Sequence, residues 1–331
     1  GWVVILSSGY NNTFGSDPDH RGKGYLYILN AKTGALIEKI STNFGTAADP
    51  SGFARPEAFI PDQTTFVADY VYGGDLKGNL WRFDLRGTPT TYDTPTLIAK
   101  LTTDGTDGSV DPTVIQPITI EPKIEVGSNG IDRWVFIGTG QLMTLSDMST
   151  TQQQTFYAIR DGSRSQVYGL GTGQTPLPTG ISFPVTRSNL VANTDLTQGR
   201  LADLTKPMGW YYDLHTFEKI TTALVANEGL ISWNGYVPTT DACAPGAASN
   251  VYVTDYDTGK SRLWVNGALL QYYSSSTYLV KVQFIKDSSG KIRAVITMGD
   301  PSGGTQMRKL DGQFGRAAGV RVRVNWREIQ E

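Results

Sequence analysis

The sequence predicts an all-β fold, a β-propeller in which sheets are arranged radially as blades around one axis. Three observations lead to this prediction. Apolar residues occur in short β-branched and aromatic runs bounded by Gly, Asp, Asn and Pro, whereas long helical patterns are nearly missing. The runs come in pairs of similar form, and the pairs recur along the chain. We therefore treat residues 1–331 as a single β-propeller domain.

Each repeat joins an apolar strand, usually ending in glycine, to a second strand of apolar–aromatic–apolar form that ends in Asp or Asn. The pairs are 2–9 with 25–30, 68–75 with 79–84, 133–138 with 155–162, 229–233 with 250–255, and 292–299 with 306–312. The equivalent positions of the second strands are Tyr27, Trp81, Tyr157, Tyr252 and Arg308. The shorter separations between them suit one four-stranded blade, and the longer ones imply inserted loops at 162–205 and 239–249.

The repeat has a physical reason. A single blade cannot bury both of its faces, whereas radially arranged blades bury each face against a neighbour. We expect the aromatic residues of the second strands to pack between blades, and the turns 32–34 and 257–259 to close hairpins. The repeats fit a closed ring of this chain alone or an incomplete larger ring, which the start inside a strand at Gly1 favours. The alternative is a β-sandwich with an appended domain.

Charge and cysteine content narrow the class of protein. The net charge is −2 with no basic stripe, so we expect no nucleic-acid partner. No apolar run approaches the roughly 20 residues of a transmembrane helix, and no signal peptide is recognised. Cys243 is the single cysteine, which excludes a disulfide within the chain. It either bonds a partner outside the chain or is a buried free thiol.

The residue types of common catalytic sites do not gather in the sequence. The two histidines, His20 and His215, fit polar turns, and no Gly-x-Ser-x-Gly elbow accompanies them. No Cys and His set has zinc spacing. The glycine-rich run 169–174 fails the dinucleotide-binding pattern. We therefore expect no enzymatic activity and no certain cofactor.

One segment carries a family resemblance. Residues 68–84 read Ala-Asp-Tyr-Val-Tyr-Gly-Gly-Asp-Leu-Lys-Gly-Asn-Leu-Trp-Arg-Phe-Asp. This run closely resembles a signature of the PilC/PilY family of type IV pilus biogenesis factors and pilus tip adhesins. Further stretches resemble the family in the same order along the whole chain: 8–12, 23–27, 136–140, 155–159, 209–214 and 325–329.

The resemblance implies a modified, quinoprotein-like β-propeller, with about five of seven blades in this chain and the upstream blades absent. It implies a non-enzymatic pilus biogenesis factor that supports pilus extension against retraction and twitching motility. The implied partners are minor pilins and the pilus tip complex, with host surface receptors as further partners under the adhesin alternative. The implied location is secreted, at the pilus tip, the outer cell surface or the periplasm of a Gram-negative bacterium.

The resemblance also raises the question of calcium. Many family members carry the pattern Asp-x-Asp/Asn-x-Asp-Gly-x-x-Asp before the Tyr-Val-Tyr strand, and calcium prefers six to eight oxygen ligands. Asp69 matches the last ligand, whereas Pro61 stands at the first, so Asp62 serves only if the loop has lost a residue. The middle carboxylates and the turn glycine are replaced within residues 63–66. We expect this loop to be empty or to bind Ca²⁺ weakly, with Asp62 and Asp69 as its candidate ligands.

Other interpretations remain open. The acidic run 104–111 has a loose calcium-loop pattern but fits ordinary turns. A host-cell or glycan adhesin would act through the inserted loops, with Tyr168, Tyr272 and Tyr273 stacking on sugars, unless these are ordinary strand aromatics. A quinone-dependent dehydrogenase is the third alternative, and many such enzymes use a vicinal cysteine pair that this chain lacks.

Overall fold

The structure is a computed structural model of the chain. It describes all residues except 14–20, 63, 89–91, 93, 107–110, 112, 128–132, 162–179, 201–204, 240–246, 266, 278, 300–304, 311, 313 and 315–331. The described elements are almost entirely strands, which confirms the all-β prediction. Cys243, His20 and Tyr168 lie outside the described residues.

The described strands form six sheets, and we number five of them as blades in chain order. Blade 1 contains β1 (Val3–Ser7), β2 (Tyr25–Asn30) and β3 (Leu36–Ser41). Blade 2 contains β4 (Glu57–Phe59), β5 (Tyr70–Gly74), β6 (Asn79–Asp84) and β7 (Thr96–Lys100). Blade 3 contains β8 (Lys123–Val126), β9 (Arg133–Gly138), β10 (Thr155–Arg160), β11 (Val191–Ala192) and β12 (Gly209–Asp213).

The last two blades follow in the same way. Blade 4 contains β13 (Val225–Asn227), β14 (Leu230–Pro238), β15 (Ala247–Asp255) and β18 (Tyr273–Ser275). A separate hairpin of β16 (Leu263–Val265) and β17 (Ala268–Leu270) is inserted between β15 and β18. Blade 5 contains β19 (Leu279–Lys286), β20 (Ile292–Gly299) and β21 (Thr305–Leu310).

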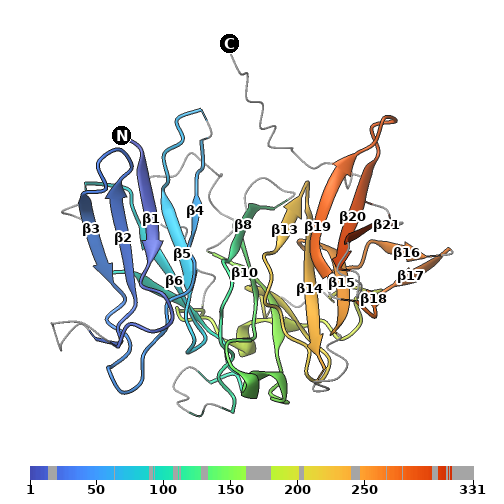
Figure 1. Cartoon of the computed structure of the whole chain (residues 1–331), viewed down its shortest axis with the longest axis horizontal. Helices are drawn as coiled ribbons and strands as arrows, with labels where there is room; N and C mark the ends of the chain where they lie inside the picture. Colours follow the sequence, from blue (N-terminus) through green and yellow to red (C-terminus); the bar gives the residue numbers. More distant parts are fainter. Residues whose placement is uncertain are drawn as a thin grey trace.

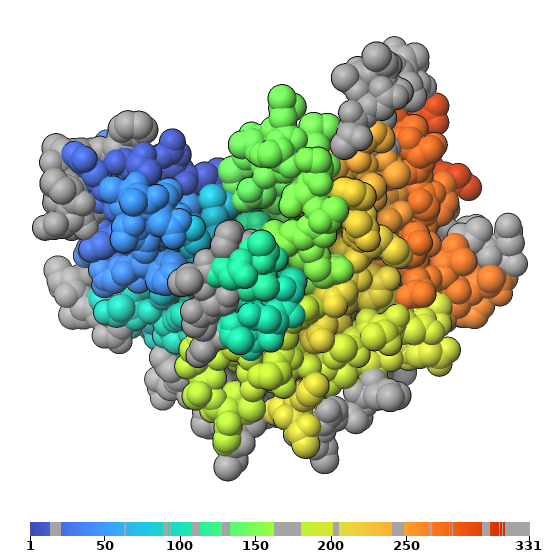
Figure 2. All heavy atoms as spheres, turned by 90° about the horizontal axis from the view of Figure 1, so that it is seen from below, coloured from blue at the N-terminus to red at the C-terminus, as the bar shows by residue number. Residues whose placement is uncertain are grey.

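The blades stand side by side in chain order. Figure 1 shows them as a fan, with blade 1 and blade 5 at opposite ends. Seen from below, the molecule shows the same order as adjacent coloured blocks from blue to orange (Figure 2). All five predicted strand pairs form antiparallel ladders: β1 with β2, β5 with β6, β9 with β10, β14 with β15, and β20 with β21. The β-propeller prediction is therefore confirmed, whereas the number of blades in a complete ring stays a prediction.

Apolar clusters fill the spaces between neighbouring blades in the described part of the chain. They join Leu26 and Ile28 to Trp81 and Phe83, Tyr72 and Leu80 to Ile137 and Tyr157, Trp134 and Phe156 to Trp233 and Tyr252, and Leu230 and Val251 to Ala294 and Ile296. Each such side chain contributes about 1.5–3 kcal/mol when it is fully buried. Packing between blades therefore supplies the main stabilisation of the fan.

The inner blades bury both faces. On β5, Tyr72 faces blade 3, whereas Val71 packs with the cluster shared with blade 1. On β10, Tyr157 faces blade 2 and Phe156 faces blade 4. Successive side chains of a strand point to opposite faces, so a strand between two blades needs apolar residues at every position. This explains why the strands read as continuous apolar runs instead of alternating ones.

The equivalent positions of the second strands make the same kind of contact in blades 2, 3 and 4. Trp81, Tyr157 and Tyr252 each pack against the preceding blade. Arg308 is exposed, yet its guanidinium lies over the Tyr273 ring of the preceding blade, 5.0 Å from the centroid. Tyr27 is half-buried on the face of blade 1 that points away from blade 2.

The predicted 257–259 turn fastens blade 4 to blade 3. Gly259 has φ of 67°, and its amide donates to the carbonyl of Asp255 at 3.2 Å. A Cβ at this position would lie 2.6 Å from Nδ2 of Asn193 and 2.9 Å from the Trp210 ring. Only glycine combines this left-handed backbone with so close an approach. The turn therefore fits against blade 3 because residue 259 has no side chain.

Candidate functional site

The contact between blades 2 and 3 combines an apolar centre with two polar networks. Its centre is apolar, with Leu80, Ile137 and Tyr157 fully buried. Two polar networks flank this apolar centre at opposite ends of β10 (Thr155–Arg160), one beside Arg160 and the other beside Thr155. We define the first network as the Asp161 cluster and the second as the Gln116 network.

The Asp161 cluster holds a buried carboxylate between two arginines. The side chain of Asp161 is 0% exposed, and it accepts hydrogen bonds from Arg82 and from the Tyr72 hydroxyl. Arg133 completes the cluster, with Nε at 3.1 Å and Nη2 at 2.8 Å from Oδ2 of Asp161. Arg82 and Tyr72 come from blade 2, whereas Arg133 and Asp161 come from blade 3. The cluster therefore ties the two blades together across their contact.

Electrostatics keeps the cluster ionised. Burial alone would raise the pKa of Asp161, but Arg133 and Arg82 outweigh it and lower the pKa to about 2. Burial raises the pKa of the Tyr72 hydroxyl well above its usual value, so the phenol stays neutral and donates. Removing one partner of such a buried pair leaves a charge unpaired, which costs about 3–5 kcal/mol.

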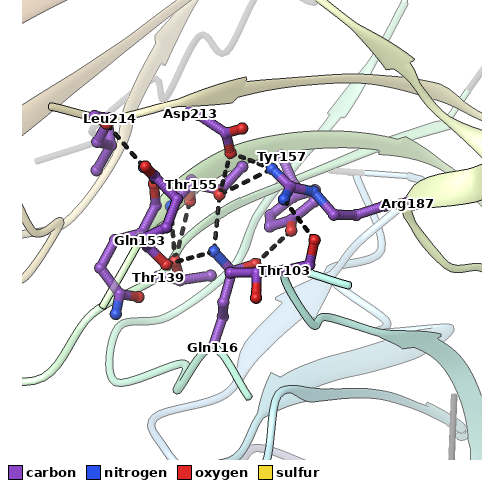
Figure 3. A network of polar contacts seen from close by, with 10 residues as sticks. Thr103, Gln116, Thr139, Gln153, Thr155, Tyr157, Arg187, Asp213 and Leu214 are labelled. Atoms are coloured by element: carbon purple, nitrogen blue, oxygen red, sulfur yellow. Dashed lines mark hydrogen bonds and ion pairs between the residues drawn. The ribbon is translucent and has the colours of Figure 1, made fainter. Parts of the chain in front are cut away.

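The Gln116 network lies at the other end of β10 and is drawn in Figure 3. Nε2 of Gln116 donates to Oγ1 of Thr155 at 2.7 Å and to the carbonyl of Gln153 at 2.8 Å, while the Tyr157 hydroxyl donates to Oε1 of Gln116. The Thr155 hydroxyl then donates to Oδ1 of Asp213 at 2.7 Å. A buried amide thus has both of its ends hydrogen-bonded, as buried polar groups require.

Arg187 joins this network from another segment. Its Nη1 donates to the carbonyl of Thr103 at 3.1 Å, and its Nη2 reaches Thr155 at 3.3 Å and pairs with Asp213 (Figure 3). Its guanidinium also lies over the Tyr211 ring, 4.1 Å from the centroid. These contacts engage blade 3 and the end of blade 2 at once.

Arg187 belongs to a strap, which we define as residues 180–192, that runs over both blades. The amide of Val185 donates to the carbonyl of Ile98 at 2.8 Å, and the carbonyl of Val185 accepts from Lys100 at 2.9 Å. Further along, β11 pairs in parallel with β12. Part of the predicted 162–205 loop is thus an added edge segment of two blades, and residues 162–179 and 201–204 lie outside the described residues.

A second buried carboxylate lies between blades 3 and 4. Glu218 accepts from the Tyr252 hydroxyl at 3.0 Å, from Nδ2 of Asn250 at 3.1 Å and from the backbone amide of His215 at 3.0 Å. A Cβ on Gly235 would lie 1.6 Å from Oε1 of Glu218, so a larger residue at this strand position would displace the carboxylate. The carboxylate is therefore built into the blade contact and is not presented to solvent.

His215 is the predicted turn histidine, and the structure gives it a partner. Its Nδ1 lies 2.9 Å from Oε2 of Glu218, while the side chain is 48% exposed. The hydrogen bond to Glu218 raises the pKa of His215, and burial opposes the shift. The ring also lies 3.4 Å from the Tyr252 hydroxyl through Nδ1. His215 thus contacts other side chains of the contact between blades 3 and 4.

The aromatic residues proposed for sugar stacking take part in blade packing. Tyr272 is half-buried, with its ring 5.0 Å from that of His215 in an edge contact. Tyr273 is half-buried under the guanidinium of Arg308. These tyrosines are therefore engaged within the molecule, while Tyr168 falls outside the described residues.

The candidate calcium ligands Asp62 and Asp69 lie at the two ends of the turn between β4 and β5. Oδ1 of Asp62 accepts from the amide of Thr64 at 2.8 Å and from its hydroxyl at 2.7 Å. Burial raises the pKa of Asp69, and Arg86 and Arg133 act on it electrostatically. Calcium needs six to eight oxygens, and two carboxylates with arginines beside one of them do not fit it.

Within the described ranges, no group of three or more His, Cys, Asp or Glu side chains is placed to hold a metal ion. In the acidic run 104–111, Asp104 and Asp111 accept hydrogen bonds from Thr106 and Thr113 two residues on. These are ordinary turn contacts, and residues 107–110 lie outside the described part.

Comparison with known proteins places the chain in a family. The sequence model of the PilY1 beta-propeller domain matches residues 1–181, more than half of the chain. This chain belongs to the PilY1 β-propeller family. The family assignment confirms the resemblance to PilC/PilY proteins that residues 68–84 carry.

The PilY1 relatives are longer than this chain. A type IV pilus biogenesis factor PilY1 homolog from Xylella fastidiosa is 27% identical over 284 residues, which is 79% of this chain and 18% of that protein. The type IV pilus biogenesis factor PilY1 of Pseudomonas aeruginosa is 27% identical over 293 residues, 78% of this chain and 24% of that protein. The chain thus spans less than a quarter of these curated relatives.

A solved PilY1 structure supports the fold. The crystal structure of the Pseudomonas aeruginosa PilY1 C-terminal domain matches with a TM-score of 0.62 at 21% identity, covering 95% of this chain and 69% of that chain. At this identity the match concerns the fold alone. In the described part of this chain, no helix combines the length and apolarity needed to cross a membrane.

Sequence reasoning missed the buried charges of the PilY1-type blades. Asp161 lies in an Arg-Asp-Gly triplet that reads as a turn, and Glu218 follows a predicted strand among polar residues. One signal was available, because Arg82 stands inside the apolar run of β6. A charge within a run that is buried on both faces needs an opposite charge on the neighbouring blade.

Proposed function

We propose that this chain forms the β-propeller part of a type IV pilus biogenesis factor and acts by binding, without catalysis. The observation that carries the proposal is the match of the PilY1 beta-propeller domain to residues 1–181, together with the fan of five blades. The names of the curated relatives, both type IV pilus biogenesis factors, support the same role.

The chemistry of the described side chains supports a binding role. The buried charges that would attract attention as catalytic groups, Asp161 and Glu218, have their oxygens occupied by neighbouring blades. Buried groups of this kind fix the arrangement of a scaffold. We propose that the rigid fan presents its outer surfaces to minor pilins and other components of the pilus tip complex.

We further propose that the parent protein works outside the cytoplasm, at the pilus tip or outer cell surface. There it would support pilus extension against retraction and thereby twitching motility. The chain covers less than a quarter of its curated relatives, so these properties are proposed for the parent protein and not for this region alone.

The proposal is tested in the bacterium that carries the parent gene. Residues 1–331 are deleted from the chromosomal copy, and surface pili are quantified by shearing and immunoblotting beside a twitching assay. We expect loss of both surface pili and twitching. Normal piliation and twitching with the deleted protein still produced would refute the pilus role.

A point variant separates loss of function from loss of the protein. Asp161→Ala breaks the contact between blades 2 and 3, and we expect it to reduce piliation. Met307→Ala changes a side chain that is 77% exposed on β21 and serves as the matched control. Immunoblots of both variants report protein level. Equal piliation in the two variants at equal protein level would contradict a role for the intact fan.

A further inference from the structure

The turn between β4 and β5, residues 60–69, takes the place of the family's calcium loop but is organised around a different set of contacts. Asp62, near the start of the turn, makes several of these contacts. Its carboxylate accepts from Thr64, and its backbone carbonyl accepts from the amide of Phe66 at 3.1 Å and from Oγ1 of Thr65 at 3.1 Å. A bridge between Asp62 and Val67 completes the turn. The side chain that would be a ligand therefore caps its own turn.

Asp69 is held at the far end of the turn by blade contacts. Its amide donates to the carbonyl of Phe59 at 3.0 Å, and its carbonyl accepts from Leu85 at 2.9 Å. Burial raises the pKa of its carboxyl group, Arg86 and Arg133 lower it, and Asp84 raises it. The Asp84 oxygens accept hydrogen bonds from Arg86, and Arg133 belongs to the Asp161 cluster. A divalent cation at Asp69 would have to approach these arginines, and like charges repel.

The tip of the turn carries an aromatic residue where the family pattern has glycine. Phe66 has φ of 56°, a left-handed conformation that favours glycine. Its ring centroid lies 5.9 Å from that of Trp2, beside blade 1. The two side chains remain 53% and 74% exposed, so they form a contact at the surface that joins blade 1 to the turn of blade 2.

We propose that this turn is independent of metal. Asp62 closes it by hydrogen bonds, and the contact between Phe66 and Trp2 holds it against blade 1 in the role that a bound cation has in a calcium loop. The conformation of the turn then does not follow the calcium concentration. This property belongs to the turn itself, so it can be tested whether or not the chain acts in pilus assembly.

The first test measures calcium directly on the purified full chain. Titration calorimetry and thermal unfolding are run with about 1 mM Ca²⁺, a level that loads extracellular calcium modules, and again with EDTA. We expect no saturable heat and the same melting temperature in both conditions. Saturable binding that disappears in both Asp62→Asn and Asp69→Asn would overturn the proposal.

A gain-of-function variant provides the positive control. Pro61→Asp, Gln63→Asn, Thr65→Asp and Phe66→Gly together restore the family pattern that ends at Asp69. We expect this variant to bind calcium and to melt at a higher temperature when calcium is added, whereas the unaltered chain does neither. Equal calcium binding by the two proteins would overturn the proposal.

Hydrogen exchange distinguishes a turn cap from a metal ligand. Asp62→Asn keeps an oxygen acceptor for Thr64 but removes the charge, whereas Asp62→Ala removes both. We expect the amide of Phe66 to stay protected in Asp62→Asn and to exchange at least several-fold faster in Asp62→Ala, with or without calcium. Equal loss of protection in both variants would mean that the charge is what the turn needs, against the proposal.

The aromatic contact is tested with a double-mutant cycle. Trp2→Ala, Phe66→Ala and the double variant are compared by the exchange rates of the amides of residues 64–69. We expect the double variant to exchange no faster than the faster single variant, because both remove the same contact. Rates that multiply independently would show that the two rings do not act together.

Discussion

Loss of the charge on Asp161 is the sharpest test of how the blades are held together. Asp161→Asn keeps the size of the side chain and one acceptor oxygen but leaves Arg82 and Arg133 without their buried counter-charge. The pKa of about 2 in the folded chain, against about 3.9 in an unfolded one, is worth about 2–3 kcal/mol at neutral pH. Measured losses for breaking buried pairs run to about 3–5 kcal/mol. We therefore expect Asp161→Asn to lower the free energy of unfolding by about 3 kcal/mol.

The pH dependence follows from the direction of the shift. Because the folded pKa of Asp161 is lower than the unfolded one, its stabilisation is complete above pH ~4 and is lost as the pH falls through about 2. The difference in the free energy of unfolding between the wild type and Asp161→Asn should therefore become about 1 kcal/mol smaller when the pH is lowered from 7 to 3.

Urea unfolding is the assay, followed by the fluorescence of buried Trp134, Trp210 and Trp233. The matched control is Asp213→Asn at the other end of the same blade contact, where the carboxylate is 43% exposed and pairs with Arg187. Because the Asp213 carboxylate is partly exposed to solvent, we expect this variant to lower the free energy of unfolding by about 1 kcal/mol or less. A loss below about 1 kcal/mol for Asp161→Asn, or a gap that stays constant with pH, would refute the reasoning.

Three further predictions concern the other contacts. Gly235→Ala places a Cβ against the carboxylate of Glu218, so we expect a loss of about 2 kcal/mol or more in urea unfolding, and a neutral effect would contradict the close approach. The pKa of His215 should lie above 6.5 in an NMR titration, and Glu218→Gln should return it towards that value; an unchanged pKa in the variant would exclude the hydrogen bond as the cause. Because the folded pKa is raised, the contribution of His215 to stability is present at low pH and is lost as the pH rises through that pKa. Arg187→Ala removes the anchor of the strap, and limited proteolysis should cut residues 180–192 several-fold faster, whereas unchanged cutting would show that backbone pairing alone holds it.

The strands and the main core positions could be predicted because they depend on local patterns. Trp81, Tyr157 and Tyr252 recur in similar runs, and burial on both faces leaves each run continuously apolar. Arg308 occupies the same place in blade 5 by a different interaction, the stacking of its guanidinium on Tyr273. The repeat thus fixes the position, whereas the chemistry at that position depends on the neighbouring blade.

The buried charges and the strap could not be predicted in the same way. One of the two arginines that pair with buried Asp161 is Arg82, 79 residues away in sequence on another blade, and no local pattern encodes that contact. The strap joins its neighbours at Val185 through backbone hydrogen bonds, which leave no mark on side-chain composition. Its Gly, Thr and Pro content therefore reads as a loop, although residues 180–192 add to two sheets.

The strap also bears on how such a protein behaves at high local concentration. An outermost strand with free amides and carbonyls is a template on which a second molecule can add its own strand, the first step of aggregation. Val185 occupies this position on β7, and β11 occupies it on β12. Two neighbouring sheets are thereby shielded by their own chain, so crowded copies of the molecule have fewer edges at which they can pair.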